Sequence, residues 1–195
     1  MKAGEKERAD VLSTCEKRTK RRRSNMSLQT MDELLEEQIS DIYSAEKQLL
    51  KALPEMANAA SSQELKHAFE NHLNETREQM HRLEQVFELL DMKPERKTCK
   101  GMAGLIREGE DVISEPGDPL VKDAALIAAA QKVEHYEISA YGTICELANQ
   151  LDNEDAKALL GKNLASEKKS DKELTKLATS GSLGASLKRK AEQAK

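Results

Sequence analysis

Apolar residues recur in alternating steps of three and four along four segments of the chain. This spacing places them on one side of a helix. We expect helices over about 31–53, 64–91, 119–150 and 153–179. Capping signals support three of the starts: Thr30 with Glu33, Ser61 with Glu64, and Asp118 before a proline. Pro54 is expected to end or kink the first helix.

The lengths of the connections predict how these helices are arranged. Two short turns join the first helix to the second and the third to the fourth, whereas residues 92–117 make a long connection with a short helix within 99–114. This predicts an all-α, ferritin-like antiparallel four-helix bundle with one long crossover. The apolar residues of the crossover either cap the bundle's own core or contact a second subunit, and the first use is favoured. They are Met102, Leu105, Ile106, Val112 and Ile113.

Ionisable residues interrupt the apolar stripe of every helix near its middle. Burying an unpaired ion costs several kcal/mol, and a domain has only about 5–15 kcal/mol of net stability. Divalent metal ions would offset this cost, and carboxylates with imidazole suit iron, manganese or zinc. The candidate metal ligands are Glu46 on the first helix, His72 and Glu75 on the second, Glu134 and Glu137 on the third, and Glu167 and Asp171 on the fourth.

Two other patterns are weighed against simpler explanations. Glu78 and His81 spell Glu-x-x-His, but His81 lies on the opposite side of the helix from His72 and is expected to face solvent. Tyr141 shares the stripe of Glu134 and either donates a hydrogen bond to a ligand or packs with its hydroxyl satisfied. Packing is favoured.

Composition supports the all-α assignment, since only 3% of the residues are aromatic and there is no Trp. No apolar run has the length of a membrane span or a signal peptide. Three widely separated cysteines, Cys15, Cys99 and Cys145, favour a reducing cytoplasm.

Charge separates residues 1–25 from the rest of the chain, and a stretch rich in glycine and serine at 180–184 separates the C-terminal end. Residues 1–25 contain nine basic and four acidic residues, so 22 of the 31 basic and 31 of the 35 acidic residues lie in 26–195. We expect a disordered basic extension over 1–25, a bundle over 26–179 and a flexible tail over 180–195. The acidic body has no reason to bind nucleic acid.

Three stretches, 40–49, 72–76 and 123–138, resemble the YciE/YciF family of bacterial stress-response proteins, and the resemblance extends over about 27–178. It implies a ferritin-like dimer with a di-metal site drawn from the seven candidate ligands. The fourth helix offers Glu167 and Asp171 where bacterioferritins carry a second Glu-x-x-His. Asp41 belongs to the first of these stretches but lies one residue off the apolar stripe.

Three functions remain open on this basis. The first is a redox-active di-iron protein that reduces oxygen or peroxide. The second is metal binding without turnover, in which iron, manganese or zinc stabilises the bundle. The third is an interaction protein without metal. We favour two iron ions per chain, in a cytoplasmic homodimer whose folded body binds neither membrane nor nucleic acid; the basic residues 1–25 either touch nucleic acid or an acidic membrane surface or are an over-extended translation start, and the second is favoured.

Overall fold

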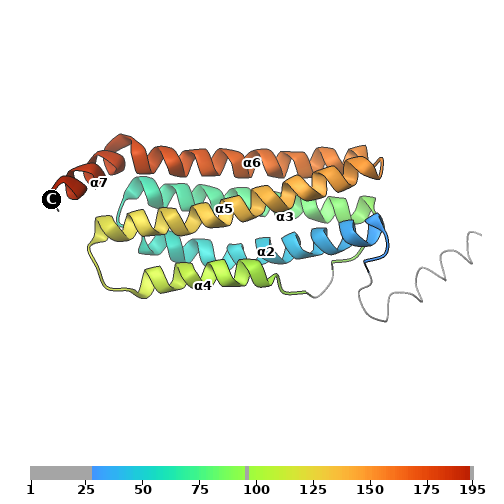
Figure 1. Cartoon of the computed structure of the whole chain (residues 1–195), viewed down its shortest axis with the longest axis horizontal. Helices are drawn as coiled ribbons and strands as arrows, with labels where there is room; N and C mark the ends of the chain where they lie inside the picture. The colour runs from blue at the N-terminus through green and yellow to red at the C-terminus, as the bar shows by residue number, and fades with distance from the viewer. Residues whose placement is uncertain (1–27, 95–96, 194–195) are drawn as a thin grey trace, which may run out of the picture.

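Four long helices form the body of the computed structural model, which describes residues 28–94 and 97–193. They lie side by side along the length of the molecule (Figure 1), and each packs against two of the others. The all-α prediction, with two short turns and one long crossover, is confirmed. The predicted extension over 1–25 lies outside the described residues. The bundle helices are α2 (Met31–Ala59), α3 (Gln63–Leu89), α5 (Pro119–Gln150) and α6 (Glu154–Thr179).

The helices begin at or next to the predicted capping residues. The Thr30 hydroxyl accepts a hydrogen bond from the Glu33 amide at 3.2 Å, and Asp118 accepts one from the Leu120 amide at 3.0 Å. Helix α3 is capped by Ser62, one residue later than predicted. The prediction that α2 ends or kinks near Leu53 is corrected in its boundary, because α2 continues through Pro54 to Ala59.

Buried Asp123 connects its own helix, α5, to the start of α3. Its carboxylate accepts hydrogen bonds from the Ser61 amide at 2.8 Å, the Ser61 hydroxyl at 2.6 Å and the Ser62 amide at 2.9 Å. A carboxylate is stabilised at a helix N-terminus by the unpaired amides and the helix dipole. This contact fixes α5 against the α2–α3 turn.

The crossover contains the short helix that the sequence predicts, α4 (Lys100–Ser114). It lies along α2 and α5 (Figure 1). Met102 is fully buried, and the other apolar residues of α4 pack partly buried against the same core. The crossover therefore serves the core of its own chain.

The C-terminal segment differs from the predicted flexible tail, because Gly181–Gln193 forms helix α7. Gly181 adopts φ +73°, which turns the chain after α6, and Leu183 is buried. A Cβ on Gly184 would lie 2.7 Å from the carbonyl carbon of Thr179, so this glycine permits close packing of α7 on α6. These glycines form the turn between α6 and α7, although a segment rich in glycine and serine would by itself suggest disorder.

Candidate metal centre

The four bundle helices bring acidic residues and one histidine together at mid-length. Glu46 comes from α2, His72 from α3, Glu134 and Glu137 from α5, and Glu167 from α6. Their exposed fractions are 0% for Glu46, Glu137 and Glu167, 3% for Glu134 and 5% for His72. The apolar seams that bury these helices thus carry the polar residues into the core.

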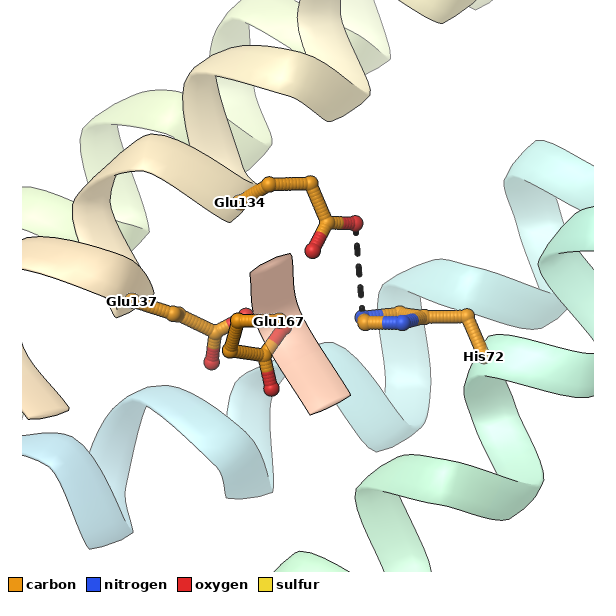
Figure 2. Close-up of side chains that lie close together, drawn as sticks. All are labelled: His72, Glu134, Glu137 and Glu167. Atoms are coloured by element: carbon orange, nitrogen blue, oxygen red, sulfur yellow. Dashed lines mark ion pairs between the residues drawn. The ribbon is translucent and has the colours of Figure 1, made fainter. Parts of the chain in front are cut away.

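Four of these side chains form a compact group, which we call the His/Glu cluster: His72, Glu134, Glu137 and Glu167 (Figure 2). Each offers one ligand atom, and these atoms all lie within 4.8 Å of one another. The His72 Nε2 atom lies 3.6 Å from Glu134 Oε1. Imidazole and carboxylates converging from facing helices are the donor set of di-metal bundle sites.

Glu46 lies beside the cluster and is held by a chain of hydrogen bonds. The Tyr141 hydroxyl donates to Glu46 and accepts from the Asn163 amide at 3.0 Å. Arg82 donates to the Asn163 carbonyl oxygen at 2.9 Å. Tyr141 therefore packs in the core with its hydroxyl satisfied while also orienting a candidate ligand. Gln79, in turn, donates to Glu167.

A second chain of polar contacts leads from His72 towards the surface. The His72 Nδ1 atom lies 3.2 Å from the Ser170 hydroxyl, and this hydroxyl donates to Glu75 Oε2 at 3.1 Å. Lys169 donates to the other Glu75 oxygen at 2.8 Å. Glu75 is therefore beside His72 at the rim and outside the His/Glu cluster.

Asp171 also lies outside the cluster, on the outer side of the α5–α6 contact. Its carboxylate accepts a hydrogen bond from Gln131 at 3.1 Å and lies 3.3 Å from the Nε2 atom of exposed His135. Of the seven predicted ligands, the structure therefore gathers five at the centre and places Glu75 and Asp171 around it. His81 is exposed, as predicted.

Burial and mutual repulsion make the core carboxylates weak acids. Burial is the main cause that raises the pKa of Glu46 and of Glu134 from 4.5 to about 8, and the charge of Glu167 adds to the effect at Glu46. Burial and neighbouring carboxylates raise the pKa of Glu137 and Glu167 well above the ordinary value. The carboxyl groups of the centre therefore resist ionisation unless a bound cation compensates their negative charge.

His72 and Glu75 respond to each other's charge. Burial opposes a positive charge on His72, but the Glu75 contact and the charges of Glu167 and Glu46 outweigh it and raise the pKa of the imidazole. The His72 contact, opposed by partial burial and aided by Lys169 and Ser170, lowers the pKa of Glu75 to about 2. Glu75 is thus ionised at neutral pH.

The unpaired atoms at the centre fit a metal site. The buried oxygens and nitrogen without a hydrogen-bond partner include both oxygens of Glu137, one oxygen each of Glu46, Glu134 and Glu167, and Nε2 of His72. In the described part of the chain, no lysine or arginine forms an ion pair with these carboxylates. Hard divalent cations take such oxygen-rich donor sets, so the residues present fit the metal that the sequence implies.

Several polar residues around the centre were not among the predicted ligands. Thr76, Asn163 and Ser170 are all buried, and the Thr76 hydroxyl has no hydrogen-bond partner. The available signal was the helical spacing, since 72, 76 and 79 share one face of α3, as 163, 167 and 170 share one face of α6. Small polar residues in such a stripe are harder to recognise as part of a site than charged residues are.

Asp41 makes a separate polar contact near α4. Its carboxylate accepts a hydrogen bond from Tyr136 at 2.7 Å, and the Tyr136 hydroxyl also lies 2.9 Å from the Cys99 sulfur. Lys97 lies 3.4 Å from the other Asp41 oxygen. Asp41 thus connects α2 with α5 and the start of α4, outside the cluster.

None of the described helices combines the length and hydropathy needed to cross a bilayer. An antiparallel bundle with one long crossover and inward carboxylates at mid-length defines a ferritin-like protein with a candidate metal centre. The chain belongs to the family described as a domain of unknown function (DUF892), which matches residues 30–186. The resemblance to the YciE/YciF family is confirmed.

Relatives of known structure agree with this assignment. The chain is 47% identical to Protein YciF of Escherichia coli over 154 residues, covering 78% of this chain and 93% of YciF. The crystal structure of that stress protein matches with a TM-score of 0.76, covering 77% of this chain and 96% of YciF. YcfI from Rhodopseudomonas palustris matches with a TM-score of 0.75 at 41% identity, covering 78% and 97% of the two chains. A Xanthomonas campestris protein shares the fold at 19% identity, with a TM-score of 0.63 and coverage of 85% and 99%.

Proposed function

We propose that the chain binds two iron ions in the His/Glu cluster together with Glu46, and that it reduces hydrogen peroxide or oxygen as part of a stress response. The observation that carries the proposal is the set of unpaired buried donor atoms on four facing helices. The description of the E. coli relative as a stress protein supports the cellular role. The family resemblance favours a homodimer, and the three widely separated cysteines favour the cytoplasm.

The donor set favours iron or manganese over zinc. Carboxylates outnumber the single imidazole at the centre, and oxygen donors suit harder ions. Two ferrous ions, when bound, supply two electrons that, with two protons, reduce one hydrogen peroxide to two waters. The chain's own part is to hold the oxygens of Glu137 and its neighbours in a buried place and to exclude bulk water.

Metal binding without turnover is the second candidate, because the raised carboxyl pKa values support cation binding without requiring a reaction. Ionised Glu46 and Glu134 oppose folding near pH 8, so a bound cation stabilises the bundle whether or not it reacts. In that case zinc or manganese would serve as well as iron. The two candidates therefore separate on redox turnover rather than on binding.

The test is to load the full-length chain with Fe(II) without oxygen, remove loose metal and count the bound iron by plasma mass spectrometry. We expect about two ions per chain, and about one peroxide consumed per two ions oxidised. Glu137→Gln should lose the iron, whereas Asp171→Asn, outside the cluster, should keep it. Retained iron that peroxide does not oxidise would select the non-catalytic candidate, and no retained metal would overturn both.

A further inference from the structure

The contacts on the far side of the His72 ring determine where its proton can lie. Ser170 is buried between His72 Nδ1, at 3.2 Å, and Glu75 Oε2, at 3.1 Å. A hydroxyl has one proton to donate, and an ionised carboxylate can only accept. The Ser170 proton therefore goes to Glu75, and its oxygen accepts from His72.

Lys169 gives this chain of hydrogen bonds its direction. Its ammonium donates to Glu75 Oε1 at 2.8 Å and favours the ionised carboxylate. With Glu75 fixed as an acceptor on both oxygens, neither it nor Ser170 can supply a proton to the ring. The ring itself must carry the hydrogen on Nδ1.

The opposite nitrogen of the ring faces the cluster. Nε2 lies 3.6 Å from Glu134 Oε1 and is buried without a hydrogen-bond partner (Figure 2). We propose that Ser170 and Glu75 are positioning residues that hold neutral His72 as its Nδ1–H tautomer, so that the Nε2 lone pair is the one offered to metal. This inference rests on the proposed function for the metal and on the metal-free contacts for the tautomer.

Positioning of this kind orients the ring and raises the basicity of the ligating nitrogen. It also assigns a role to Glu75, which the sequence suggested as a ligand and the structure places behind the ring. Glu75 would act on the metal through Ser170 and His72.

The first test is NMR of the metal-free, full-length chain with ¹⁵N-labelled histidine, at rising pH until the His72 ring is neutral. Long-range proton–nitrogen spectra distinguish a protonated from an unprotonated ring nitrogen. We expect a protonated Nδ1 and a bare Nε2 for His72. The chain has four histidines, and exposed His67, His81 and His135 serve as internal references for solvated rings. A protonated Nε2 on neutral His72 would overturn the inference.

The second test measures Zn²⁺ affinity by competition with a chelator, because zinc is redox-inactive and leaves the NMR signals sharp. Ser170→Ala should weaken the tautomer preference, because Glu75 Oε2 then remains 3.8 Å from Nδ1, and should bind Zn²⁺ about 10–100-fold more weakly, as loss of an outer hydrogen bond does elsewhere. Ser166→Ala, the same change one turn earlier on α6, is the matched control and should bind normally. Ser170→Thr restores the hydroxyl and should restore the tautomer.

The outcomes separate this inference from the proposed function. A Ser170→Ala variant with wild-type tautomer and wild-type Zn²⁺ affinity would overturn the positioning role. If the wild-type chain binds no metal, the proposed function fails, while the spectra of the metal-free chain still decide the tautomer. Glu75→Gln adds a check on direction: its amide can donate to Ser170, so the preference for Nδ1–H should weaken.

Discussion

Glu134→Gln should make the metal-free bundle less sensitive to alkaline pH. Burial raises the pKa of Glu134 from 4.5 to about 8. A raised folded-state pKa means that the stability contribution is present below pH 4.5 and is lost as pH rises through about 8. Between pH 5 and pH 8, linkage gives a fall of about 3 kcal/mol in the free energy of unfolding from this carboxyl alone. The glutamine keeps the side-chain shape without the ionisation.

The assay is urea unfolding followed by circular dichroism at pH 5 and pH 8, with chelator present. The wild-type protein should lose about 3 kcal/mol more than Glu134→Gln over this interval, at equal m-values. Glu146→Gln, the same change at an exposed position of α5, should keep the wild-type pH dependence. Parallel pH profiles for wild type and Glu134→Gln would contradict this prediction, because ionisation of the buried carboxyl would then not lower the free energy of unfolding.

Three further changes test contacts around the centre. Tyr141→Phe leaves Glu46 and Asn163 without their shared partner, and urea unfolding should show a loss of about 1–3 kcal/mol. Asp123→Ala leaves the Ser61 and Ser62 amides of the α2–α3 turn without their acceptor and should cost about 1–3 kcal/mol in the same assay; an unchanged midpoint would contradict this anchoring role. Gly184→Ala places a Cβ 2.7 Å from the carbonyl carbon of Thr179 at the end of α6. Hydrogen exchange in α7 should therefore accelerate, while the four long helices keep their protection.

The sequence pattern determines the phase of α2 and α5 well. The residues that the sequence places on the apolar stripes of these two helices, Glu46 on α2 and Glu134, Glu137 and Tyr141 on α5, are all buried. Large apolar residues lie on both sides of the acids along each seam, so only one helical phase buries them all. The apolar spacing of each helix is therefore enough to predict that these acidic residues are buried, without information about the neighbouring helices.

On α3 and on α6, one side chain buried at the site lies one residue away from the ligand expected on that helix. The structure buries Thr76 where Glu75 was expected, and Ser170 where Asp171 was expected. Steps of three and four are both compatible with a helix face, and the choice between them fell on the charged residue. Only packing against the opposite helix decides the step, and that information is absent from a single helix.

Helix α7 shows the same dependence on tertiary contacts. Glycine and serine at 180–184 suggest disorder when taken alone. In the structure Gly181 turns the chain and Leu183 buries its side chain in the core, so a short helix is retained by docking. Local propensity is overridden here by burial that the sequence pattern does not display.

The most direct test of the proposed centre is anomalous diffraction at the iron edge from crystals of the Fe(II)-loaded protein. We expect about two anomalous peaks per chain, between α2, α3, α5 and α6 and in contact with Glu137, Glu167 and Nε2 of His72. Peaks only at surface carboxylates such as Asp171, or no peaks in a fully loaded crystal, would contradict this expectation.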